Sequence, residues 1–148
     1  MFEKISTALI DLLKTNTKIQ SFYNFEASNL EGYPALTITP SGNENQYSTT
    51  TENSRVYPFM VRLYVERGSG NDAERTCEST MRDLVDTVTD KIDRNFNLST
   101  ILAQTGYTFL MISAAPSAWG YAGRENNLRV AEIIVRVHYD IDTTLVGS

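Results

Sequence analysis

The chain contains one histidine, His138, and one cysteine, Cys77, so few side chains are available for nucleophilic catalysis. A nucleophile–base pair needs a serine or cysteine with a histidine within reach. His138 stands in a predicted strand beside Tyr139 and Asp140, and no Gly-x-Ser-x-Gly motif accompanies it. We interpret it as a strand histidine on the less buried face. Cys77 falls on the apolar stripe of a predicted helix, where a free cysteine serves as a small hydrophobic residue.

Carboxylates at helical spacing are the other group with possible chemistry. The aspartates are Asp83, Asp86, Asp90 and Asp93. At this spacing they could bind a divalent ion or act as an acid–base pair. Basic residues interleave with them, however, which favours a solvated helix face. The turn Gly68-Ser69-Gly70 lacks the spacing and the lysine of a phosphate-binding loop. We therefore expect no enzyme activity, no cofactor and no metal site.

Length and charge narrow the class of protein further. The 148 residues correspond to one domain, residues 1–148, with enough chain to bury a core. Thirteen basic and eighteen acidic residues give a net charge of −5, which disfavours a protein that binds nucleic acid by neutralising phosphates. A single cysteine excludes an intrachain disulfide. No stretch is apolar enough to predict a membrane span, so we expect no membrane association.

Two amphipathic helices are predicted from apolar residues three and four positions apart. The first starts at Phe2, and the second starts at Asn71 and ends near Asn95. Asn71 and Glu74 have the spacing of a capping box. The predicted buried stripe of the second helix is Ala73, Cys77, Met81, Leu84, Val85, Val88 and Ile92.

Four strands are predicted around these helices. They cover residues 34–40, 57–65, 107–114 and 129–141, and the polar residues 142–148 are expected to fray. The third strand is apolar on both faces, which is typical of a central strand. The order α-β-β-α-β-β predicts an α+β domain with a mostly antiparallel four-stranded sheet and two helices on one face.

Two segments between these elements are candidate contact surfaces. Residues 40–54 form a long polar arm, which is either a tolerated surface loop or an outward hairpin. Residues 116–127 are predicted to form a loop that either exposes its tryptophan as an interface anchor or packs it back over the sheet edge. The candidate interface residues are Asn45, Tyr47, Thr49, Thr51, Trp119, Tyr121 and Arg124.

The order of these elements resembles that of the tail terminator proteins of tailed phages, also called tail completion or head–tail joining proteins. The resemblance includes the Pro-flanked strand Pro34-Ala35-Leu36-Thr37-Ile38, the polar arm, and the aromatic-rich strand at 57–65. It implies a homo-oligomeric ring, expected to be a hexamer, that caps the tail tube and joins it to the head. It also implies a place in the tail or neck of a virion assembled in the host cytoplasm. The implied partners are the tail tube protein and the connector or neck proteins.

The acidic charge agrees with a ring whose lumen lets DNA pass without specific binding, because binding by counterion release requires cations on the protein. Other classes remain open from the residues alone. They are another head–tail connector or tail-tube component, a small protein-binding module, and a soluble enzyme.

Overall fold

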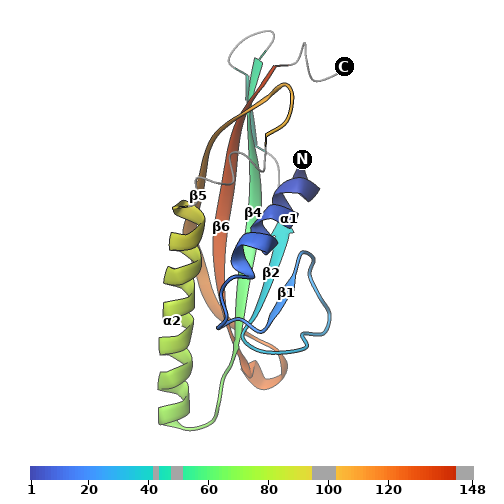
Figure 1. Cartoon of the computed structure of the whole chain (residues 1–148). Helices are drawn as coiled ribbons and strands as arrows, with labels where there is room; N and C mark the ends of the chain where they lie inside the picture. The colour runs from blue at the N-terminus through green and yellow to red at the C-terminus, as the bar shows by residue number, and fades with distance from the viewer. Residues whose placement is uncertain (42–43, 48–51, 95–102, 143–148) are drawn as a thin grey trace.

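Two strands of fifteen residues each, β4 (Glu52–Glu66) and β6 (Leu128–Asp142), form the centre of the molecule. They pair antiparallel without interruption, from Glu52 opposite Asp142 to Glu66 opposite Leu128. The structure is a computed structural model and describes residues 1–41, 44–47, 52–94 and 103–142 (Figure 1).

The remaining strands lie on either side of this pair. Five strands follow the spatial order β1-β2-β4-β6-β5, and β3 pairs with β4 as a sixth strand. The outer strands are β1 (Ser21–Tyr23), β2 (Ala35–Pro40), β3 (Glu44–Tyr47) and β5 (Tyr107–Ala122). The helices are α1 (Phe2–Leu13), α2 (Asn71–Asp93) and the short 3-10 turn η1 (Arg124–Asn126).

The prediction of a four-stranded antiparallel sheet with the order α-β-β-α-β-β is wrong. The described order is α1-β1-β2-β3-β4-α2-β5-β6, and the sheet is mixed because β1 pairs parallel with β2. Strand β1 escaped prediction because three residues are too few to display a period of two. Strand β3 lies in the polar arm, and its pairing with the start of β4 confirms the hairpin interpretation of that arm.

Two predictions for the third strand of the sequence analysis are also wrong. This strand, β5, is an edge strand rather than a central one, and it extends through Ala122 instead of ending at Ala114. Residues 116–122 therefore belong to a strand and not to a loop. A proline is tolerated here because β5 has a free edge and its register shifts between Pro116 and Ala118.

The main core lies between the sheet and both helices, which cover the same face (Figure 1). Alternation along β6 places every second side chain in this core, and these are Ala131, Ile133, Val135, Val137, Tyr139 and Ile141. Residues Tyr57, Phe59, Val61, Leu63 and Val65 of β4 are buried in the same way, as predicted. The predicted stripe of α2 is confirmed as buried except for Ala73, which is half-buried.

The start of α2 differs from the predicted capping box. The helix begins at Asn71, and the N-cap is Gly70, which makes no side-chain hydrogen bond. The φ angle of Gly70 is 93°, a region that favours glycine. Glu74 forms an ion pair with Arg67 on the segment that leads into the helix, 3.2 Å between Nη2 and Oε1.

The other face of the sheet carries a smaller cluster around Tyr64, which is 8% exposed. The Tyr64 hydroxyl donates to Glu26 at 2.9 Å, and Arg62 bridges Glu26 and Glu132 at 3.1 Å each. Burial, and then the hydrogen bond to Glu26, raise the pKa of Tyr64 to about 12. The loop after β1 is thereby fixed against this face.

We expect Leu84→Ala to lower the free energy of unfolding by about 2–5 kcal/mol, because Leu84 is fully buried and its truncation leaves a cavity. Urea denaturation followed by circular dichroism measures this change. The exposed Ser79 of the same helix provides the control, and Ser79→Ala should stay within about 0.5 kcal/mol of the wild type. Equal effects of the two substitutions would contradict the assigned core face of α2.

Stability should also fall in alkali. The unfolded Tyr64 ionises near pH 10 and the folded one near pH 12, so the unfolded state loses its proton first as pH rises between these values. Ionisation of Tyr64 should lower the free energy of unfolding by about 2–3 kcal/mol over this window. Below pH 9 Tyr64 is protonated in both states, so it should not make the free energy of unfolding depend on pH. Denaturation at stepped pH tests this, because Tyr64→Phe should have a shallower slope than the wild type.

Candidate assembly interface

The large apolar side chains that the described residues expose are concentrated at the two outer edges of the sheet. Leu110, Met111, Trp119 and Tyr121 lie on β5 and are between 44% and 51% exposed. Phe25 is 56% exposed and follows β1, at the opposite edge, by two residues. Large apolar side chains that are exposed at a sheet edge mark candidate interaction sites.

The outer edge of strand β5 carries no charged residue. No strand pairs with that edge among the described residues, and none of the sixteen residues of β5 is charged. Edge strands normally carry charges that prevent pairing with another chain. At one point the end of α2 reaches this strand, where the Ala114 amide donates to Asp93 Oδ1 at 2.9 Å. The composition of β5 is therefore one that does not oppose pairing with another strand.

The predicted interface residues Trp119 and Tyr121 lie on β5, opposite Ala131 and Arg129 of β6. The Arg129 guanidinium lies 5.7 Å from the Trp119 ring centre and 4.7 Å from that of Tyr121. Cation–π contact of this kind holds both rings at the sheet edge and leaves about half of each exposed. Arg124 is exposed on η1, just beyond the end of β5.

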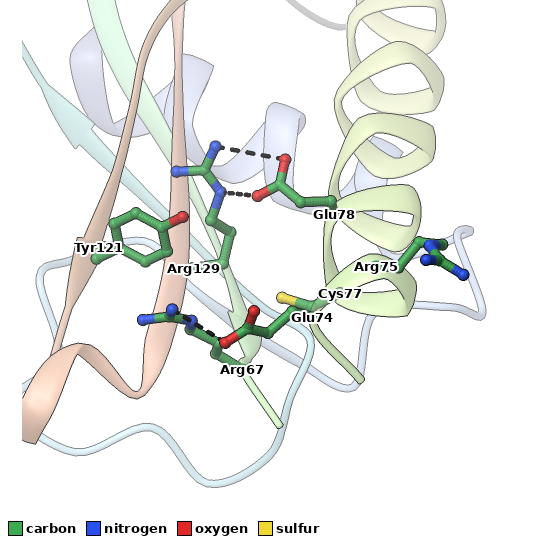
Figure 2. A pocket seen from close by; sticks show the side chains of 7 residues that line it. All are labelled: Arg67, Glu74, Arg75, Cys77, Glu78, Tyr121 and Arg129. Atoms are coloured by element: carbon green, nitrogen blue, oxygen red, sulfur yellow. Dashed lines mark hydrogen bonds and ion pairs between the residues drawn. The ribbon is translucent and has the colours of Figure 1, made fainter. Parts of the chain in front are cut away.

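A pocket of about 230 Å³ lies between the Tyr121 ring and α2 (Figure 2). It is lined by Arg67, Glu74, Arg75, Cys77, Glu78, Tyr121 and Arg129. In Figure 2 Arg129 points from β6 toward Glu78, and Arg67 points toward Glu74. The Arg67–Glu74 and Arg129–Glu78 ion pairs therefore balance charge within the pocket. The Arg129–Glu78 pair also links α2 to β6 of the sheet.

Arg129 is the central residue of this junction. Its side chain is 12% exposed, its Nε donates to Glu78, and its Nη1 donates to the Gly120 carbonyl at 2.9 Å. A largely buried guanidinium needs such partners, because an unpaired charge in this position would be strongly destabilising. Arg129 therefore connects three elements: β6, the backbone of β5 and α2.

The predicted interface residues of the arm lie elsewhere. In β3, Asn45 is opposite Arg55 and Tyr47 is opposite Asn53. Thr49 and Thr51 lie outside the described residues. Because β3 is on the β2 side of β4, the arm and the Trp119 segment are at opposite edges of the sheet. The structure thus divides the predicted set into two separate surfaces.

The residues considered for chemistry are dispersed. His138 is half-buried on the face away from the helices, opposite Val56 and Met111. Burial, and then the neighbouring Glu78 charge, raise the pKa of the Cys77 thiol, so it is protonated at neutral pH. Asp83 forms an ion pair with Lys18 at 2.8 Å. Within the described part of the chain, no three His, Cys, Asp or Glu side chains are grouped as metal ligands.

Three exposed apolar residues of the two edges were not among the predicted site residues: Phe25, Leu110 and Met111. The signal in the sequence was the length of the uncharged stretch at 107–122. The predicted central strand followed by a loop would place no exposed sheet edge at these residues, whereas β5 is an edge strand along its whole length.

Similarity to known proteins is found among solved structures. No protein family model and no curated protein matches the chain. A chain in a solved structure described as a virion of native gene transfer agent (GTA) particle is similar, with a TM-score of 0.41 and 13% identity over 94% of this chain and 90% of that chain. Within the described residues, no helix has the length and apolar character to cross a membrane. The function proposed below rests on the geometry of the chain itself.

The Arg129–Glu78 ion pair should contribute measurably to stability. We expect a double-mutant cycle with Arg129→Met and Glu78→Gln to give a coupling energy of about 1–3 kcal/mol, because the arginine is largely desolvated. Thermal and urea unfolding measure it. The pair Asp72–Arg75 on the exposed face of α2 is the matched control and should give no measurable coupling. Similar coupling in both cycles would contradict the role of Arg129.

Proposed function

We propose that this chain is a virion structural protein of the tail-terminator type. It acts as one subunit of a ring, expected to be a hexamer, that caps a tail tube and joins it to the head or neck. It performs no catalysis and needs no cofactor. DNA passes through the lumen of the ring without specific binding.

The observation that carries this proposal is the position of the exposed apolar side chains at two different edges of the sheet. A subunit with two unlike contact surfaces on opposite sides assembles head to tail, and such an assembly closes into a ring when the rotation between neighbours allows it. A binding module for one protein ligand needs only one such surface.

Two further properties support a structural role. The net charge of −5 suits a channel for DNA, since few cations would retain the phosphates. The pocket beside Tyr121 is lined by two Arg–Glu pairs, which leaves little unmatched charge for a small ligand. The predicted interface residues Asn45, Tyr47, Thr49 and Thr51 would then belong to one contact surface, and Trp119, Tyr121 and Arg124 to the other.

Native mass spectrometry and negative-stain imaging of the purified chain test the proposal. We expect a single oligomer near six times the subunit mass, seen as rings with a central opening, because the two edges satisfy one another only in a closed assembly. A monomer at micromolar concentration would contradict the ring. Rings that fail to cap purified tail tubes of the parent particle would support the connector alternative instead.

A further inference from the structure

We propose that neighbouring copies join by continuing the sheet, with the outer edge of β5 in one copy paired antiparallel to the β1 and β3 edge of the next. This inference rests on the proposed function, because it specifies how the subunits of that assembly meet. It identifies the occupant of the β5 edge as a second copy of this chain.

The strand directions are compatible with this junction. Strands β4 and β5 run in one direction, because each pairs antiparallel with β6. Strands β2 and β3 pair antiparallel with β4, and β1 is parallel to β2, so all three run in the opposite direction. When a copy is rotated about an axis along the strands, its β1 and β3 therefore meet the neighbour's β5 as antiparallel strands. Antiparallel addition of a strand to an open edge is a common mode of protein association.

The two edges also present their aromatic residues at the same level along the strands. Pairing across the sheet connects Trp119 through Ala131, Leu63 and Leu36 to Phe22 in β1. Phe22 is followed by Tyr23 and the exposed Phe25, whose rings are in edge-to-face contact at 5.6 Å. A rotation without a shift along the strands thus brings Trp119 of one copy level with Phe22 of the next, on the face of the sheet that the helices cover.

A second level of the sheet behaves in the same way. Pairing across the strands connects Met111 through His138 and Val56 to Glu44, the first residue of β3. The exposed pair Leu110 and Met111 is therefore level with β3 of the arm. β3 adjoins β4 directly whereas β1 lies beyond β2, so the far edge is stepped, and a different stretch of β5 faces each of these two strands.

The charges beside the edges are complementary. Arg124 follows β5, and Glu31 lies in the loop after β1, where its amide donates to the Tyr23 hydroxyl at 2.9 Å. Both residues are exposed, and neither forms an ion pair with another described residue. A two-fold pairing of β5 with β5 of another copy would leave Phe25 and Glu31 without a role. The head-to-tail junction uses both edges.

Mixing two variants, each with one edge blocked, tests this polarity. Met111→Lys places a charge on the β5 edge, and Phe25→Lys places one at the β1 edge; both positions are about half exposed, so the fold should be kept. The control Ser79→Lys adds the same charge on the exposed face of α2. Circular dichroism and thermal unfolding verify the fold of each variant. Leu110→Lys and Phe25→Glu replace any variant that unfolds.

We expect each edge variant alone to be monomeric by native mass spectrometry, while an equimolar mixture forms a heterodimer. In that mixture the intact β5 edge of one variant meets the intact β1 and β3 edge of the other, and the junction cannot propagate. The Ser79→Lys control should keep the mass of the wild-type assembly.

Other outcomes separate this inference from the proposed function. If Phe25→Lys keeps the wild-type mass while Met111→Lys is monomeric, β5 pairs with itself and the head-to-tail junction is wrong. If both variants keep the wild-type mass, the contacts lie elsewhere on the subunit, although an assembling protein remains. A wild-type chain that is itself monomeric would overturn the proposed function and the junction together.

Discussion

The uninterrupted antiparallel ladder between β4 and β6 is the constraint on which the rest of the molecule depends. Fifteen residue pairs hold the two strands in a single register, so the alternation of side chains is the same along their whole length. One face of both strands is consequently apolar and receives the helices. The remaining strands have to attach at the outer sides of this pair. β2 and β3 attach to β4, and β5 attaches to β6.

This arrangement produces a sheet with two unlike edges. One edge is built from short strands and a loop that is tied down by Glu26, Arg62 and Tyr64. The other is a single long strand without charge. A natural sheet protects an exposed edge with charged residues or bulges, and β5 has only the bulges and Pro116. Lack of charge on an exposed strand is costly for a monomer but is useful for a subunit whose edge is covered after assembly.

The Arg129 junction explains how such an edge keeps its shape. Strand β5 is held on one side by β6, and Arg129 links its backbone at Gly120 to Glu78 of α2. The rings of Trp119 and Tyr121 rest on the same guanidinium. Fixed side chains lose little conformational freedom when a partner binds, so less of the binding energy is spent on ordering. The ion pairs that line the pocket thus help to hold the Trp119 and Tyr121 rings in place.

The two helices, the buried stripe of α2 and the apolar faces of β4 and β6 can be predicted from the amino-acid sequence, because they depend on residue periods within one element. The sequence also determined the concentration of polar residues in the arm. The sequence did not predict three features of the sheet. These are the strand β1, the extension of β5 past Pro116 and the edge position of β5. Strand order depends on which hydrogen-bonding edges meet across long separations in sequence, and no local period records it. For the same reason the sequence grouped Tyr47 with Trp119 in one interface, whereas the sheet places them at opposite edges.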